Sequence, residues 1–460
     1  MIKLNADLLK GKILQSLLIF AFPIFISNVF QQLYNTVDTM IVGNFLGDES
    51  LAAIGACSAI FELLVGFAIG ISSGLGIVTA RSYGSGDKEL LKRSVAGSII
   101  IGVIVTTVIM ILSTMFLSPL LRLLNTPEDI MEEAYSYISV VTLLVGVMFA
   151  YNLCAGLLRA IGNSIMPLVF LIISSVLNIV LDLAFITQFH MGIRGAAVAT
   201  VISQCVSAIF CIFYIIKKCP MLLPQRRHFH VEKELYIELI GQGLSSGFMV
   251  SIVSMGTVIL QTAINGLGYL VIAGHVSARK LNSFCIMPLT TMALAISTFV
   301  SQNKGANQGE RIRKAVKYAT IFSICWGALI SLILLFAAPI LVKVLSGSSE
   351  SVVINNGSAY LRINSPFYMI LGMLFTFRYS LQGIGKKFVP LISSIIELGG
   401  KIIFVAIFIP ILNYMGVILC EPIIWCFMCA QLAYSFYHND YIRSFKAKNN
   451  TSLKQRDLQI

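Results

Sequence analysis

The chain has 460 residues, of which 57% are hydrophobic and only 12% are charged. Soluble domains carry about 25% charged residues, so this composition, with a mean hydropathy of +0.87, excludes an ordinary soluble protein and predicts a polytopic membrane protein. The formal net charge of +12 would suit nucleic-acid binding in a soluble chain, but basic and acidic clusters alternate as they do around membrane spans, so we expect no nucleic-acid partner.

Twelve apolar segments reach the length of about 20 residues that a helix needs to cross a bilayer. They are 13–43, 51–79, 94–117, 133–157, 164–188, 195–216, 236–264, 272–301, 316–342, 357–381, 388–411 and 414–437. With a cytoplasmic amino terminus, the basic clusters and the carboxyl terminus all fall on the cytoplasmic side. The first segment is too long for a signal peptide and is expected to remain as a span. The predicted fold is therefore all-α, with twelve transmembrane helices.

The first span carries a polar stripe. Steps of three and four residues place its members on one helical face, and they are Asn28, Gln31, Gln32, Asn35 and Asp38. An ionised carboxylate in hydrocarbon costs at least about 2.5–3.5 kcal/mol, so this face must look onto protein or water. Asp38 is thus a candidate ion or proton site. The four amide residues, together with Asn152 of the fourth span, are expected to line a substrate cleft.

Pro23 lies inside the same span. It removes one backbone hydrogen bond and permits a kink in the helix. We interpret Pro23 as a hinge that responds to the charge state of Asp38. A fixed kink is the alternative, because prolines are common in membrane helices.

The second span combines a small-residue face with an acid. Glycines recur every four residues at Gly66, Gly70 and Gly74, a spacing that allows close contact with another helix. Glu62 lies near the middle of the same span. It either pairs with Arg279 or Lys280 of the eighth span or serves as a second protonatable group.

The fifth span carries a second intramembrane acid, Asp182. The step from Pro167 to Asp182 is 182 − 167 = 15, equal to the step from Pro23 to Asp38, 38 − 23 = 15. Each acid therefore lies about 22 Å beyond its proline, at similar depth in the outer part of the membrane. With Asn178 one turn away, the two carboxylates either hold Na⁺ through hard oxygens or share a proton. A structural hydrogen-bonded pair is the alternative, but buried acids without a basic partner are costly.

The two halves of the chain repeat each other. The segment 83–95 matches 304–316 with an offset of 305 − 84 = 221, and 161–167 matches 384–390 with an offset of 390 − 167 = 223. Each repeat holds six spans, which predicts two parallel six-helix bundles with a central site between them. The predicted domains are a bundle at 1–220, a basic cytoplasmic linker at 221–235, a bundle at 236–440 and a cytoplasmic tail at 441–460. The linker is expected to set topology, with binding of anionic lipid as the alternative.

The second half has no counterparts of the two acids. At the repeat offsets, Ile259 and Val405 stand where the first half has Asp residues. Glu397 precedes Lys401 by four residues, which predicts an intrahelical ion pair that Arg378 joins. A tethered ammonium group can substitute for a bound cation. We therefore expect a structural charge network here, and we assign the coupling ion to the first half.

The sequence contains no motif that predicts an enzyme. The ten cysteines lie mostly in apolar runs, where packing is favoured over redox or metal chemistry. The five histidines show no metal-ligand spacing, and neither HExxH nor a GxSxG on a span occurs. We predict that the protein is not an enzyme and has no cofactor besides a coupling ion, with no metal other than Na⁺.

Three segments carry a family resemblance. They are Pro23…Gln31…Tyr34…Asp38…Val42-Gly43 in the first span, Asn178-x-x-x-Asp182 in the fifth, and Met287-Pro288…Ser301-Gln302-Asn303-x-Gly305-Ala306 with a following Arg311 in the eighth. They resemble the multidrug and toxic compound extrusion family, in particular its bacterial branch of DNA-damage-inducible F-type transporters.

The resemblance implies efflux of drug-like, mostly cationic amphipathic compounds by alternating access, against entry of H⁺ or Na⁺. It points to an amino-terminal ion site made of Tyr34, Asp38, Asn178, Asp182 and Thr200. It further implies a multi-pass protein of the bacterial cytoplasmic membrane, in contact with lipid and expected to function as a monomer.

Two other transporter classes remain as alternatives. A flippase of lipid or lipid-linked oligosaccharide, from the same superfamily, would need further spans and a cationic cavity for phosphates, whereas the first-half cleft is acidic. A major facilitator also has parallel six-span repeats, but the loop 81–93 lacks the Gly-x-x-x-Asp-Arg-x-Gly-Arg pattern. The choice between H⁺ and Na⁺ stays open.

Overall fold

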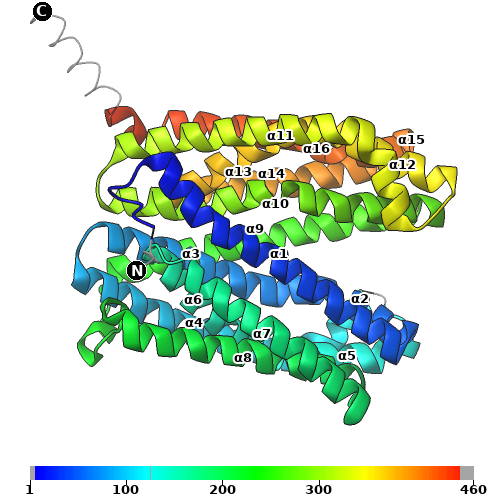
Figure 1. Ribbon diagram of the computed structural model, residues 1–460, viewed down its shortest axis with the longest axis horizontal. Helices are drawn as coiled ribbons and strands as arrows, with labels where there is room; N and C mark the ends of the chain where they lie inside the picture. Colours follow the sequence, from blue (N-terminus) through cyan, green and yellow to red (C-terminus); the bar gives the residue numbers. More distant parts are fainter. Residues whose placement is uncertain (1–5, 125, 446–460) are drawn as a thin grey trace, which may run out of the picture. The chain divides into compact units, whose positions relative to one another are not determined.

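The computed structural model describes residues 6–124 and 126–445, and within these ranges the regular structure is helical (Figure 1). The α-helices are α1 (Ile13–Leu46), α2 (Asp48–Phe61), α3 (Phe67–Gly84), α4 (Lys88–Leu123), α5 (Glu128–Leu143), α6 (Val145–Ala160), α7 (Ile165–Leu183), α8 (Gly192–Lys218), α9 (Lys233–Asn265), α10 (Tyr269–Gly305), α11 (Gly309–Ser346), α12 (Ser351–Asn364), α13 (Tyr368–Gly383), α14 (Phe388–Ile403), α15 (Ile409–Leu412) and α16 (Tyr414–Tyr437). Three π-helical turns follow α2, α7 and α14: η1 (Glu62–Gly66), η2 (Ala184–Gln188) and η6 (Phe404–Phe408). Short 3₁₀ turns are η3 (Pro220–Leu222), η4 (Arg226–Phe229) and η5 (Ser365–Phe367).

The helices coincide with the twelve predicted spans. Ten helical stretches of the described chain, counted through the π turns η1, η2 and η6, are long and apolar enough to cross a membrane. The pair α5 and α6, bent by 47° at a short break, makes an eleventh. The remaining window, 357–381, falls on α12 and α13. The turn η5 divides these two helices, and neither alone has the length of about 20 residues that a span requires.

The chain forms two compact units. Of the described residues, the first comprises Ala6, Asp7 and those within Leu18–Ser254, and the second comprises Leu8–Leu17 and Met255–Phe445. Within the first unit α3 packs on α6 and α7 on α8, and within the second α10 packs on α13 and α14 on α16. These are equivalent helix pairs of the two repeats, so the repeat seen in the sequence is also a repeat of packing.

The division between the compact units falls inside α9, between Ser254 and Met255, while the domain boundary at 236 stays a prediction. Glycines account for the packing of the first part of α9. A Cβ on Gly74 of α3 would lie 2.5 Å from the carbonyl oxygen of Gln242 in α9, and one on Gly70 would lie 2.8 Å from that of Ser246. The first half of α9 thus packs backbone to backbone on α3, as the small-residue face predicted, and belongs with the first unit.

The eighth-span motif has a structural role at the start of the chain. Asn303 donates from its side-chain amide to the carbonyl oxygen of Leu8 at 3.0 Å, and Arg311 donates to the carbonyl oxygens of Leu8 and Gly11 at 3.1 and 2.9 Å. The two side chains are joined by a hydrogen bond from Arg311 Nε to Asn303 Oδ1. These bonds lie within the second unit, to which Leu8–Leu17 belongs.

The glycine contact gives a direct stability test. Gly74→Ala forces a methyl group against α9 backbone that has no side chain to move aside, and we expect it to destabilise the purified protein by about 2 kcal/mol, read as a lower melting temperature. Gly55→Ala in α2 is the matched control, since a Cβ there meets nothing within 4 Å. Equal melting temperatures for the two variants would contradict the close α3–α9 contact.

Candidate functional site: an acidic pocket in the first unit

The first unit contains a pocket with a volume of about 300 Å³. Residues of α1, α2, α6 and α8 contribute most of its wall. Six of the residues predicted for the ion site or the cleft line it: Gln31, Tyr34, Asn35, Asp38, Asn152 and Thr200. Sequence reasoning missed other lining residues, among them Phe61, Tyr137, Met148, Tyr151 and Gln204.

Two of the predicted cleft residues, Asn28 and Gln32, do not line this pocket. Helical geometry accounts for both. Gln32 follows Gln31 directly and therefore points about 100° away around the axis of α1. Asn28 lies about 4.5 Å further along the axis, toward the start of the helix. Only part of the polar stripe of α1 therefore lines the pocket.

The structure brings Asp38 of α1 and Asp182 of α7 together. Their carboxyl groups lie within hydrogen-bonding reach of each other, and Asp182 is completely buried. Asp38 Oδ1 and both carboxylate oxygens of Asp182 have no hydrogen-bond donor among the described residues. In their ionised forms the two groups offer only acceptors to each other. This contact is satisfied when the pair holds a proton or a small cation.

The other predicted ion-site residues surround this pair. Asn178 donates from Nδ2 to Thr200 Oγ1 at 3.5 Å, while its Oδ1 is another buried oxygen without a donor in the described chain. Tyr34 is close enough to both carboxyl groups to interact with them electrostatically, and its hydroxyl bonds to the side chain of Gln204. The arrangement is a cluster of hard oxygen ligands in which two formal negative charges require neutralisation.

The π-helical turns occur beside the charged positions of the membrane helices. The turn η1 begins at Glu62, η2 begins two residues after Asp182, and η6 begins three residues after Lys401. A π turn inserts one extra residue into a helix and frequently marks a functional site. A π turn follows both α7 and α14, which are equivalent helices of the two repeats. The repeats therefore share this backbone irregularity, although only the first carries an acid, Asp182, beside it.

Helix α1 continues through Pro23 without interruption. The hydroxyl of Ser27 donates to the carbonyl oxygen of Pro23 at 2.9 Å. Pro23 is buried and precedes Asp38 by about four turns of the same helix. A bend at this position would therefore change the direction of the helix segment that carries Asp38.

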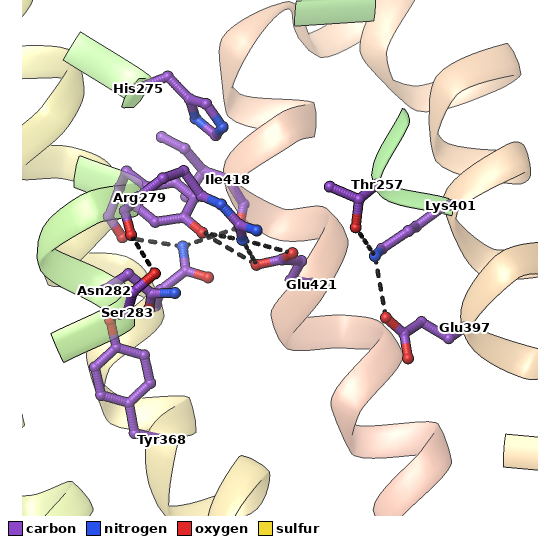
Figure 2. Close-up of polar contacts among 12 residues, drawn as sticks. Thr257, His275, Arg279, Asn282, Ser283, Tyr368, Glu397, Lys401, Ile418 and Glu421 are labelled. Atoms are coloured by element: carbon purple, nitrogen blue, oxygen red, sulfur yellow. Dashed lines mark hydrogen bonds and ion pairs between the residues drawn. The ribbon is translucent and has the colours of Figure 1, made fainter. Parts of the chain in front are cut away.

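The second unit contains the predicted ion pair (Figure 2). Lys401 Nζ donates to Glu397 Oε1 at 3.0 Å and approaches Thr257 Oγ1 at 3.5 Å. Arg378 Nη2 lies 3.8 Å from the other oxygen of Glu397. A Cβ on Gly256 would lie 2.9 Å from Lys401 Cδ, so glycine leaves room for the long side chain. The ammonium group sits among oxygens, as a bound cation would.

A second ion pair in this unit, between the buried Glu421 and the partly exposed Arg279, was not predicted from the sequence (Figure 2). Arg279 Nη1 donates to both carboxylate oxygens of Glu421, at 2.9 and 3.0 Å, and the hydroxyl of Tyr360 donates to Glu421 Oε2 at 3.0 Å. Arg279 thus has a partner within its own unit, and Glu62 accepts a hydrogen bond from Ser254. The available signal was an acid inside the long apolar helix α16.

Lys401 supplies a test of the structural network. Lys401→Ala leaves the nearly buried Glu397 carboxylate with Arg378 as its remaining cation, and we expect a loss of about 2 kcal/mol in stability. Dependence on the ion gradient should persist in the folded fraction. Melting temperature and gradient-driven transport measure the two effects, with the exposed Lys386→Ala as the control. Selective loss of ion dependence at Lys401 would contradict its structural role.

The sequence model of the MatE family matches residues 23–184 and again residues 246–407. Together the two matches cover more than half of the chain. The offset between them is 246 − 23 = 223, which is one of the two offsets found in the internal repeat.

Named relatives and solved structures agree with this match. The chain is 29% identical to the probable multidrug resistance protein YoeA of Bacillus subtilis over 85% of this chain and 86% of that protein. It is 23% identical to the multidrug export protein MepA of Staphylococcus saprophyticus over 92% of each. A crystal structure of MATE in the bent conformation superimposes with a TM-score of 0.87 at 24% identity, covering 96% of this chain and 98% of that one, which establishes the fold. The chain thus belongs to the MatE family, the multidrug and toxic compound extrusion proteins, and is a multi-pass membrane transporter and not an enzyme.

Proposed function

We propose that this transporter exports amphipathic organic compounds, mostly cations, in exchange for H⁺ or Na⁺ that enters at Asp38 and Asp182. The observation that carries the proposal is the pair of the half-buried Asp38 and the buried Asp182, in which three of the four carboxyl oxygens lack donors among the described residues. Asp38 lines a pocket of about 300 Å³. The names of the relatives YoeA and MepA, a multidrug resistance protein and a multidrug export protein, support export of drug-like compounds.

The mechanism is alternating access with mutual exclusion of ion and substrate. Binding of the ion neutralises the acidic pair and removes the electrostatic attraction that a cationic substrate feels in the pocket. The substrate in turn raises the cost of neutralising the pair, because coupling between two ligands is reciprocal. Pro23, which precedes Asp38 on α1, is the proposed hinge that converts the charge state of the pair into a change in helix direction.

The orientation and assembly form part of the proposal. Both termini are cytoplasmic, in a bacterial cell membrane, because basic loops remain on the cytoplasmic side. The transporter functions as a monomer, in contact with membrane lipid and without a bound cofactor other than the coupling ion.

The charge of the pocket argues against a phosphate-bearing lipid as cargo. The described residues that line it include Asp38 and Glu62 but no Lys, Arg or His. Such a wall attracts cations and repels phosphate groups. We therefore favour organic cations over lipid or lipid-linked oligosaccharide.

Reconstituted liposomes test the function. Export of a fluorescent organic cation is measured under an imposed H⁺ gradient, under an imposed Na⁺ gradient, and with neither. We expect one gradient to drive accumulation against the substrate gradient. Flux that follows only the substrate gradient under all three conditions would overturn the proposed antiport.

A further inference from the structure

Glu62 is an exposed carboxylate in the middle of a membrane span. Charged groups in this part of a membrane protein face the interior of the bundle or a water-filled cavity. The structure identifies the cavity, because Glu62 lines the same pocket as Asp38. Its position is also the first residue of the π turn η1, where the helical hydrogen-bond ladder is locally altered.

The surroundings of Glu62 differ from those of the acidic pair. Glu62 Oε2 accepts a hydrogen bond from Ser254 Oγ at 2.7 Å, whereas Asp182 is completely buried with both oxygens lacking a donor among the described residues. A neutral donor such as Ser254 leaves the charge of Glu62 uncompensated. Glu62 therefore presents a solvated negative charge to whatever enters the pocket.

The two acidic positions are separated along the pocket. Helices α1 and α2 are joined at Gly47, so their depths can be counted from this turn. The count is 46 − 38 = 8 from Asp38 to the end of α1, and 62 − 48 = 14 from the start of α2 to Glu62. With the usual rise of an α-helix these counts correspond to about 12 Å and about 21 Å, which places Glu62 about 9 Å deeper than Asp38.

Apolar and aromatic side chains line the same pocket as Glu62. Phe61, Ile69, Met148 and Tyr151 contribute to the lining. Aromatic faces attract organic cations, and a methionine side chain adapts its shape to different ligands. This combination suits an amphipathic cation whose charged group contacts a carboxylate while its apolar body lies on the adjoining side chains.

We propose that Glu62 binds the positively charged group of the substrate, and that Asp38 and Asp182 are reserved for the coupling ion. This assignment rests on the proposed export function and adds the residue that selects the substrate. Substrate and ion then occupy different carboxylates: Glu62 in the pocket for the substrate, and Asp38 of the pocket with the adjacent Asp182 for the ion. A cationic compound binds more tightly than a neutral compound of the same shape, and Glu62 carries the difference.

The test compares two dyes of nearly equal shape. One is the permanent cation N-methyl-4-(4-dimethylaminostyryl)pyridinium, and the other is its unmethylated pyridine analogue, which is neutral at alkaline pH. Binding to the purified full-length transporter is measured by fluorescence at alkaline pH. For Glu62→Gln we expect at least about a tenfold weaker affinity for the cation, as loss of a charged contact implies, and less than about a twofold change for the neutral dye.

Two further variants control for folding and for general charge. Glu62→Asp keeps the charge and should keep most of the preference for the cation. Glu49→Gln removes an exposed acid in the first turn of α2, outside the pocket lining, and should bind both dyes as the wild type does. An unchanged cation affinity in Glu62→Gln, or an equal loss for both dyes, would overturn the assignment.

Measurements of gradient-driven export distinguish a failure of this inference from a failure of the proposed function. Glu62→Gln should export the neutral dye under the same ion gradient as the wild type. If Glu62→Gln exports neither dye against its gradient, Glu62 belongs to the ion site and the inference fails while antiport stands. If the wild type shows no gradient-driven export but does show the Glu62-dependent dye preference, the proposed function fails and the recognition role of Glu62 stands.

Discussion

Asp38→Asn is expected to abolish the dependence of export on the ion gradient while leaving the pocket able to bind substrate. The amide has nearly the shape of the carboxyl group but can neither take up a proton nor carry the charge that attracts a cation. In the wild type, addition of the coupling ion should weaken substrate affinity by a factor of about 5 to 150, the usual range of coupling between two sites. In the variant this factor should fall to about one, measured by dye binding with and without the ion.

Variants of the partner acid Asp182 and of the exposed acid Asp129 serve as a second test and as a control. Asp182→Asn should have the same effect, and the double variant should add little, because the two carboxyl groups act as one unit. Asp129→Asn, at an exposed position in the first turn of α5, should retain coupling. If Asp38→Asn keeps full coupling to both the H⁺ and the Na⁺ gradient in liposomes, the ion site lies elsewhere.

The fold could be predicted from short-range patterns in the sequence. Apolar length located all twelve helical segments, because the bilayer fixes how long a spanning helix must be. The matched spacing of Asp38 and Asp182 from their prolines predicted a similar depth, and the structure brings these two side chains together. Helical periodicity also predicted the ion pair between Glu397 and Lys401.

Local sequence patterns could not predict contacts between segments that lie far apart in the chain. Glu421 and its partner Arg279 lie on different helices, far apart in the chain, and no local spacing connects them. The division of α9 between two compact units depends on Gly70 and Gly74 of α3, whose partner helix the sequence did not identify. Assignment to the DNA-damage-inducible branch stays a prediction.

The two repeats share their helix packing and the π turn that follows α7 and α14, but they satisfy their polar groups differently. Asn178, Asp38 and Asp182 leave oxygens without donors among the described residues of the first unit. In the second unit the ammonium group of Lys401 lies beside Glu397. A tethered cation cannot be exchanged, whereas an unfilled oxygen cluster can take up and release one. This difference supports the proposal that ion exchange takes place in the first unit, while the ammonium group of Lys401 stays paired with Glu397 in the second.

The ion pair of Arg279 with the buried Glu421 is expected to give the largest stability effect in the second unit. Arg279→Met removes the guanidinium and leaves Glu421, whose side chain is only 10% exposed, with the hydroxyl of Tyr360 as its donor. Breaking a buried pair on one side costs about 3 kcal/mol, at the lower end of the usual range because the Arg279 side chain is 36% exposed. A lower melting temperature of the purified transporter measures this loss.

Replacing both partners distinguishes the cost of burying an unpaired charge from the stability that the ion pair itself contributes. The double variant Arg279→Met with Glu421→Leu should recover most of the stability, since an apolar pair leaves no carboxylate uncompensated. Lys314→Met is the matched control: it breaks the exposed pair of Lys314 and Glu310 in the same unit and should change stability by less than about 1 kcal/mol. If the double variant were as unstable as Arg279→Met alone, packing of the arginine and not the isolated charge of Glu421 would determine the loss.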